Sequence, residues 1–110
     1  MEISVKPLKH VDIVSVTGRI DSATAPEFDT ALKGLLDHGR KKIVLDFARL
    51  DYVSSAGLRA MLSALKAAKN GGGNLVLVKV NDRIRDTLTL VGFQSLFLQF
   101  NEVVEAVDSF

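Results

Sequence analysis

Two adjacent serines, Ser54 and Ser55, are the residues in this sequence best placed to do chemistry. They precede apolar residues that recur at the spacing of a helix with one buried face, namely Leu58, Met61, Leu62, Leu65 and Ala68. A serine at a helix start can cap the helix, because its oxygen accepts a hydrogen bond from a free backbone N–H. It can also carry a phosphate, because the same N–H groups and the helix dipole favour negative charge.

The residues that follow the serines favour a functional role over capping alone. Ala56 and Gly57 have small side chains that would leave the site open to a large partner. Arg59, one turn after the serines, is the basic residue best placed for an acidic partner surface or for a phosphate on Ser55. We therefore favour Ser55 as a functional residue, with a purely structural cap as the alternative.

The sequence lacks the side-chain arrangements of an enzyme or a metal site. There is no cysteine, and His10 and His38 fall in predicted surface turns without a third ligand at metal-binding spacing. Asp46 and Asp51 suggest a phosphate-accepting receiver domain, but the first predicted hairpin offers only Asp12 as a further ligand for its cation. No Ser-His-Asp arrangement or nucleophile elbow is recognisable. We expect a binding protein with no metal and no cofactor, and not an enzyme.

The chain before the serines predicts a hairpin, a helix and a strand. Apolar and polar residues alternate over 3–5 and 14–16 on either side of Pro7, which is typical of a β-hairpin. Thr24 begins a T-A-P-E segment that predicts a capped helix start, and a helical apolar pattern follows until a glycine. A continuous apolar run over 41–47 predicts a buried central strand, joined to the serines by a short polar and aromatic link.

After the serine helix, glycine-rich residues 70–74 predict a turn that leads to a buried strand over 75–80. The order strand, helix, strand implies a right-handed parallel crossover. The rest of the chain predicts a third helix capped by Asn81 or Asp82, a short strand over 96–100, and a terminal helix with Val103, Val104 and Val107 facing inward. The fold class is therefore α/β, with helices packed on a mixed sheet.

Composition limits the class of protein further. With 110 residues, 47% of them hydrophobic, the chain suits a single domain over 1–110 with one core. Its 14 basic and 13 acidic residues give no basic field for nucleic acid or an acidic membrane. The start has no signal-peptide pattern, and no apolar run approaches the roughly 18 residues of a membrane span. We expect a soluble, cytoplasmic protein without nucleic-acid binding or membrane insertion.

Five segments spread along the chain form a combined pattern: G-R-I-D at 18–21, V-L-D-F at 44–47, S-S-A-G-L at 54–58, the G-G before the strand over 75–80, and L-x-L-x-G-F at 88–93. Together they resemble the STAS-domain anti-sigma-factor antagonists of bacteria over nearly the whole chain. Members of that family carry D-S-[S/T/A]-G-L where a helix opens. The resemblance implies a STAS-like fold, in which a mixed sheet of about five strands has an N-terminal hairpin and about four helices lie mainly on one face.

Two departures from the family pattern bear on the site. The usual Asp is Ser54 here, and the third motif position, which carries the phosphorylated hydroxyl in some members, is Ala56. The resemblance therefore implies Ser55 as the phosphoacceptor, because Ala56 has no oxygen to phosphorylate, with Ser54 as the fallback. The expected partner-binding residues are Asp21, Ser54, Ser55, Ala56, Gly57 and Arg59. For Asp21 the alternative is a turn residue that bonds its own backbone.

The resemblance also implies a function through partners. The expected partner is an anti-sigma factor, in this family often a serine kinase, whose capture frees a sigma factor for transcription. A phosphatase would then reactivate the phosphorylated protein. The alternative is a non-phosphorylated STAS module that acts as a structural subunit of a signalling or lipid-transport complex, and Ser54 in place of Asp is the feature that favours it.

Overall fold

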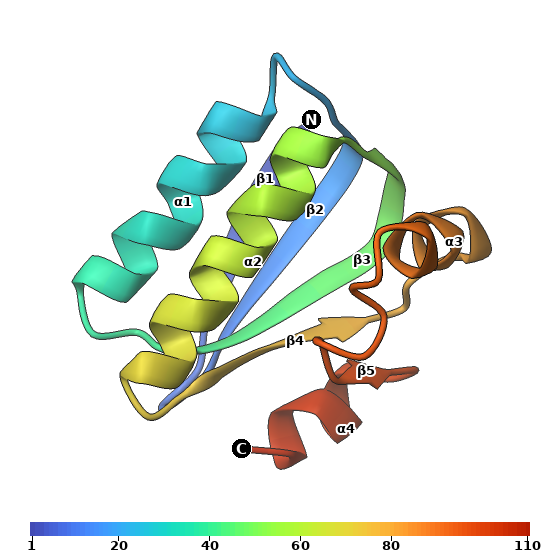
Figure 1. Cartoon of the computed structure of the whole chain (residues 1–110). Helices are drawn as coiled ribbons and strands as arrows, with labels where there is room; N and C mark the ends of the chain where they lie inside the picture. The colour runs from blue at the N-terminus through green and yellow to red at the C-terminus, as the bar shows by residue number, and fades with distance from the viewer.

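The computed structural model describes residues 1–110 and shows a five-stranded mixed sheet with four helices (Figure 1). The strands follow one another in the order β1-β2-β3-β4-β5; β1 is antiparallel to β2, and the other neighbours are parallel. The elements are β1 (Glu2–Pro7), β2 (Asp12–Ile20), α1 (Ala25–Asp37), β3 (Lys42–Val53), α2 (Ser55–Asn70), β4 (Asn74–Val78), α3 (Asp82–Leu90), β5 (Gln99–Phe100) and α4 (Val103–Asp108). The predicted α/β fold with an N-terminal hairpin is confirmed.

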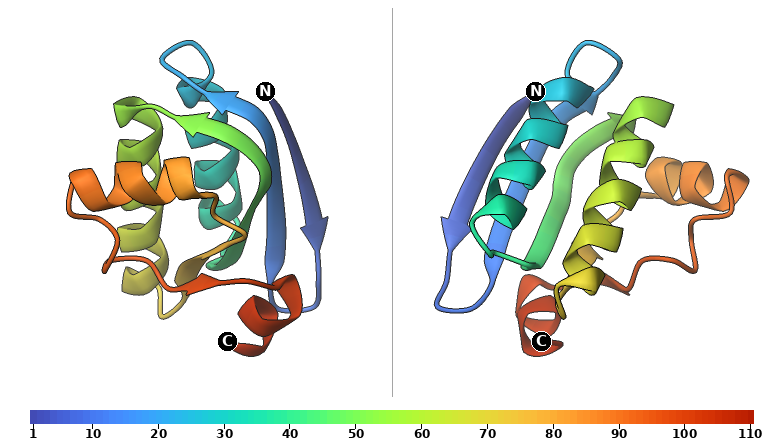
Figure 2. Two further views of the ribbon diagram at one scale, coloured as in Figure 1. Left: turned by 90° about the vertical axis from the view of Figure 1, so that its right-hand side faces the viewer. Right: turned by 60° about the vertical axis from the view of Figure 1, so that its left-hand side comes forward.

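The helices divide unequally between the two faces of the sheet (Figure 2). The larger hydrophobic core lies between the sheet and α1, α2 and α3, and includes Phe28, Met61 and Leu88 from these helices. The smaller core lies on the other face, where Ala106 of α4 packs among valines such as Val44. The prediction that the helices lie mainly on one face is therefore confirmed.

The central strand is longer than predicted, because β3 continues through the segment expected to be a link. It stays paired with β2 to the end, where Ile20 lies opposite Val53. The register shifts in the middle, and there the carboxylate of Asp46 accepts a hydrogen bond from the N–H of Ala48 at 3.0 Å. Asp46 thus lies inside the strand, and its carboxylate bonds the backbone of the same strand. The polar residues that looked like a link are exposed side chains of a strand.

The first helix begins without the predicted threonine cap. Thr24 has a helical backbone, with φ −99° and ψ −18°, so its side chain makes no capping bond. Its hydroxyl instead donates to the carbonyl of Arg19 at 3.0 Å and accepts from the N–H of Asp21 at 2.9 Å. Thr24 therefore ties the loop before the helix together, and a proline in the first turn supports the helix start.

Three expectations near the C-terminus are corrected by the structure. β4 ends at Val78 because Lys79 has a left-handed backbone with φ 58°, which a strand does not accommodate. β5 contains only Gln99–Phe100. Val104 was expected to face inward but is 70% exposed, because the single short α4 turns only its other side toward the sheet. As predicted, Asn81 caps α3, and its side chain accepts a hydrogen bond from the N–H of Ile84.

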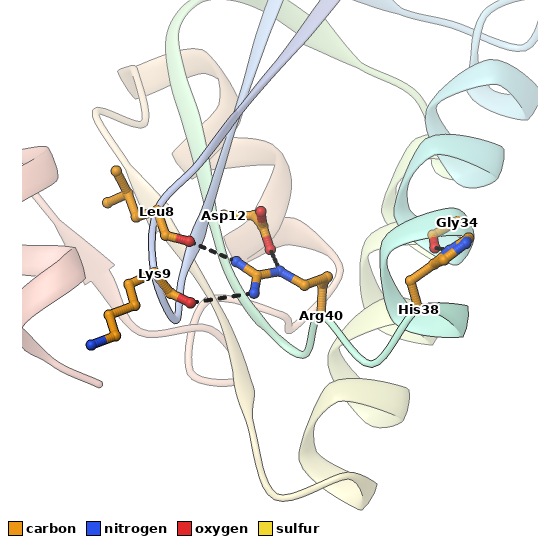
Figure 3. Close-up of polar contacts among 6 residues, drawn as sticks. All are labelled: Leu8, Lys9, Asp12, Gly34, His38 and Arg40. Carbon is orange, nitrogen blue, oxygen red and sulfur yellow. Dashed lines mark hydrogen bonds and ion pairs between the residues drawn. The ribbon is translucent and has the colours of Figure 1, made fainter.

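A partly buried ion pair between Arg40 and Asp12 joins two loops at the N-terminal ends of β2 and β3 (Figure 3). Asp12 is only 2% exposed, and its carboxylate accepts a hydrogen bond from Nε of Arg40 at 2.6 Å. The same guanidinium donates to the carbonyl of Leu8 at 2.9 Å. The bond to Asp12 raises the pKa of Arg40 above its ordinary value. Arg40 thus fastens the β1–β2 turn to the loop between α1 and β3, at the opposite end of β3 from the serines.

Candidate functional site

Ser54 is the N-cap of α2 and is held on both sides by hydrogen bonds. Its backbone is extended, with φ −82° and ψ 171°, and its Oγ accepts a hydrogen bond from the N–H of Gly57 at 3.2 Å. Its own N–H donates to the carbonyl of Ile20 at 2.7 Å, so the start of α2 is tied to the end of β2. The half-buried Ser54 therefore performs the capping role predicted for a serine at this position.

Ser55 is the first residue of α2 and differs from Ser54 in its exposure and in its side-chain bonding. Its side chain is exposed, and none of the side-chain hydrogen bonds of the chain involves its hydroxyl. The following N–H groups of the first turn lie beside it, where helices tolerate added negative charge. Of the two serines, Ser55 therefore offers the accessible hydroxyl.

Gly57 is buried. The sequence led us to expect that it would leave the site open to a partner, and its burial corrects that expectation. A Cβ at this position would lie 2.7 Å from Cγ2 of Ile20 and 2.7 Å from Cγ2 of Val53. Only glycine lets the first turn of α2 approach the ends of β2 and β3 this closely. Ala56 is half-buried and remains at the surface beside Ser55. Gly57 thus supports the site from beneath.

Asp21 lies in the loop after β2 and organises that loop. Its Oδ1 accepts hydrogen bonds from the N–H groups of Ala23 and Thr24, both at 3.0 Å. The N–H of Thr24 is the main cause that holds the pKa of Asp21 below its ordinary value, and the nearby charge of Arg19 adds to it. The loop lies beside the serines, since Ile20 bonds Ser54. Asp21 therefore bonds the backbone of its own turn, which is the alternative role that the sequence offered for it.

Two hollows flank the first turns of α2, and Arg59 lies on the wall of both. One, of about 410 Å³, lies between α1 and α2 and includes Asp29 and Ala56 in its lining. The other, of about 140 Å³, is lined by Ser55, Leu58, Arg59, Val91 and Phe93. Arg59 is exposed, and no ion pair within the chain engages its guanidinium. Ala56 and Ser55 therefore lie in the walls of different hollows, and Arg59 lies in the walls of both.

The structure adds residues that sequence reasoning did not connect with the serines. Arg19 lies over the ring of Tyr52 at 4.4 Å, and these two residues are paired across the ends of β2 and β3. Val91 and Phe93 reach the serine hollow from the end of α3. Only the three-dimensional fold brings Val91 and Phe93 beside the first turns of α2, although both lie within the last segment of the combined sequence pattern.

The described side chains contain no group of three or more His, Cys, Asp or Glu placed to hold a metal ion. None of the helices has the length and apolar character needed to cross a bilayer. What remains is a small α/β domain that presents an exposed serine on the first turn of a helix, beside two hollows.

Comparison with known proteins identifies the family of this domain. The family model described as the STAS domain matches residues 2–106. BtrV of Bordetella bronchiseptica, assigned as an anti-sigma factor antagonist, is 33% identical over 110 residues, which covers 100% of this chain and 95% of that protein. An anti-sigma-B factor antagonist of Staphylococcus epidermidis is 28% identical over 107 residues, covering 96% of this chain and 98% of the relative. The chain belongs to the STAS domain family.

A solved structure shows the same fold at lower identity. The anti-sigma factor antagonist SpoIIAA in its unphosphorylated form superposes with a TM-score of 0.86 at 14% identity, covering 98% of this chain and 95% of that one. The phosphorylated form of SpoIIAA, from Bacillus, gives a TM-score of 0.78 at 15% identity, with 98% of both chains covered. The five-stranded sheet with its four helices is thus a STAS fold.

Proposed function

We propose that this protein is an anti-sigma-factor antagonist, which binds an anti-sigma factor and so releases a sigma factor, and that phosphorylation of Ser55 switches it off. The observation that carries the proposal is the exposed, unbonded hydroxyl of Ser55 on the first turn of α2. Membership of the STAS family and the names of the two relatives support the same activity. The proposed activity is binding and not catalysis.

The proposed switch works by charge at the docking surface. Ser55, Ala56 and Arg59 lie together at the start of α2, beside both hollows. A phosphate on Ser55 adds about −1.5 to −2 charges at neutral pH. A charge that is buried without a partner at an interface costs on the order of 2–5 kcal/mol, which corresponds to roughly 30-fold or more in affinity. No change of fold is needed, because α2 already tolerates negative charge at this end.

The partners follow from this mechanism. The anti-sigma factor would itself be the serine kinase that modifies Ser55, and a separate phosphatase would restore the active form. Ser54 is a poor acceptor in comparison, because its Oγ is engaged with the N–H of Gly57 and its side chain is half-buried. We therefore assign the phosphate to Ser55 and retain Ser54 as the cap.

The proposal is tested by incubating the purified protein with ATP and each ATP-binding anti-sigma factor of its own organism, followed by mass mapping and binding calorimetry. We expect one phosphate on Ser55. Ser55→Asp should weaken binding at least tenfold, whereas Ser55→Ala should bind like the wild type and resist phosphorylation. Ser109→Ala, at the far C-terminal end, is the matched control and should still be phosphorylated.

Two results would contradict the proposal in different ways. Equal affinity of the aspartate and alanine variants at position 55 would exclude the charge switch but leave constitutive binding. Absence of binding to every anti-sigma factor would exclude the antagonist function itself, and would favour a structural subunit instead.

A further inference from the structure

Exposed apolar side chains gather at one place on the molecule, next to the serine site. Of the six large hydrophobic residues that are exposed, four lie between positions 90 and 98, and Leu90 has the highest exposed fraction at 87%. Leu98 is 55% exposed, Val91 45% and Leu96 41%. Single exposed apolar residues are common on any protein surface, but a cluster marks a contact surface. We call the exposed Leu90, Val91 and Leu96, together with the half-buried Phe93, the apolar shoulder.

The apolar shoulder is held in a defined conformation. Gly92 ends α3 with a left-handed backbone at φ 78°, and Phe93 donates its N–H back to the carbonyl of Leu88 at 2.8 Å. Leu96 donates in turn to the carbonyl of Phe93 at 3.0 Å. The exposed side chains therefore project from an ordered helix end, which lowers the entropy cost of binding through them.

The shoulder is continuous with the proposed docking residues. Val91 and Phe93 line the 140 Å³ hollow together with Ser55, Leu58 and Arg59. No carboxylate is among these lining residues, so the hollow combines apolar walls with one positive charge. Its chemistry is complementary to an apolar side chain followed by an acidic residue.

We infer that the apolar shoulder is the second half of the surface that binds the anti-sigma factor. In this interface the partner inserts an apolar side chain between Val91 and Leu58, and it places a carboxylate against Arg59. This inference rests on the proposed function and specifies its interface. It also gives the switch a location, since a phosphate on Ser55 would stand on the wall of the hollow that the apolar side chain fills. Leu90 would pack over the rim, with its large exposed surface covered only in the complex.

The test uses the full chain and the purified anti-sigma factor that phosphorylates Ser55. Leu90→Glu should weaken binding in calorimetry by at least about tenfold, because the complex would bury the new carboxylate without a partner against apolar side chains. The matched control is Val104→Glu on α4, since Val104 is also apolar and 70% exposed but lies on the opposite face of the sheet. It should bind within about twofold of the wild type. Both positions are exposed, so thermal unfolding of the two variants should match that of the wild type.

Photo-crosslinking provides an independent readout. With p-benzoylphenylalanine in place of Leu90, the protein should crosslink to the anti-sigma factor, and phosphorylation of Ser55 should abolish the crosslink. The same group in place of Val104 should not crosslink.

Several outcomes would overturn the inference. Wild-type affinity of Leu90→Glu, with binding of the wild type intact, would remove the apolar shoulder from the interface and leave the proposed function standing. A wild-type dimer in sedimentation that becomes monomeric with Leu90→Glu would show that a second copy of the chain covers the shoulder. If the wild type binds no anti-sigma factor, the proposed function fails and this inference fails with it.

Discussion

Ser54 and Ser55 are adjacent and chemically identical, yet their backbones give them different tasks. The extended backbone of Ser54 directs its oxygen toward the N–H of Gly57, whereas the helical backbone of Ser55 directs its side chain outward. A cap must be fixed in order to stabilise a helix, and a phosphoacceptor must be accessible to an enzyme. One residue cannot readily serve both needs, so under the proposed switch Ser54 is the cap and Ser55 is the phosphoacceptor.

The division of tasks predicts different effects on stability. Ser54→Ala should lower the free energy of unfolding by about 1 kcal/mol, because the N–H of Gly57 loses its partner. Ser55→Ala should change it by less than about 0.5 kcal/mol, since no hydrogen bond is lost. Urea unfolding of the two variants measures both quantities. An equal loss in both would mean that the serines share the cap.

The sequence predicted a functional site at Ser54 and Ser55, but it did not show which of the two serines caps the helix. The helical period from Leu58 onward locates the helix start only to within a residue or two, and a shift of one residue exchanges the cap with the first helical position. For the same reason Ala56 and Gly57 looked alike as small residues, although one lies at the surface and the other against the sheet. Their burial depends on which side of the helix each residue occupies, and composition does not contain that information.

At the scale of elements, the position of the serines depends on how closely α2 approaches the sheet. Gly57 makes that approach possible, because Ile20 and Val53 occupy the space where a side chain would lie. The first turn of α2 is therefore fixed at the ends of β2 and β3, and the exposed Ser55 is presented from a rigid support.

Gly57→Ala should lower the free energy of unfolding by roughly 1–3 kcal/mol, because the added methyl group forces Ile20 and Val53 to move. Gly34→Ala is the matched control, since Gly34 is an exposed residue within α1 with no atom within 4 Å of its missing Cβ. That substitution should raise stability by about 0.5–1 kcal/mol through helix propensity. Thermal or urea unfolding checks both, and a neutral Gly57→Ala would contradict the close approach.

Most elements could be predicted from periodicity, and the second half of β3 shows where this fails. The hairpin, the buried strands and the three longer helices follow from apolar spacing of two or of about 3.6 residues. Beyond Asp46 the strand register shifts, and exposed polar residues such as Arg49 interrupt the apolar run. Pairing with β2 maintains this part of the strand, and such pairing between distant segments leaves no local pattern.

At the scale of the whole molecule, the two ends of the central strands have separate roles. One end carries the serine site. At the other end Arg40 joins two loops, because it binds the buried Asp12 and the carbonyl of Leu8. None of Leu8, Asp12 and Arg40 lines the hollows beside Ser55. We therefore expect that a substitution of Arg40 changes stability without changing recognition.

Arg40→Met should lower the free energy of unfolding by about 1–3 kcal/mol, because the buried carboxylate of Asp12 loses its hydrogen-bond donor. The double variant Arg40→Met/Asp12→Leu should lose less than the two single variants combined, since an apolar pair leaves no buried charge. Affinity for the anti-sigma factor should stay within about twofold of the wild type in the folded single variant. A strict sum of the single effects in urea unfolding would show that the two side chains act separately.

The order of the strands in the sheet is the same as their order in the chain. Each new strand therefore pairs with the strand synthesised just before it. A turn connects β1 to β2, and each later connection contains one helix. No strand has to insert between two others that have already paired, so loop closure is limited to short segments at every step. The sheet can grow from β1 toward β5 as the chain leaves the ribosome, and the serine helix gains its support on β2 and β3 before the last third of the protein exists.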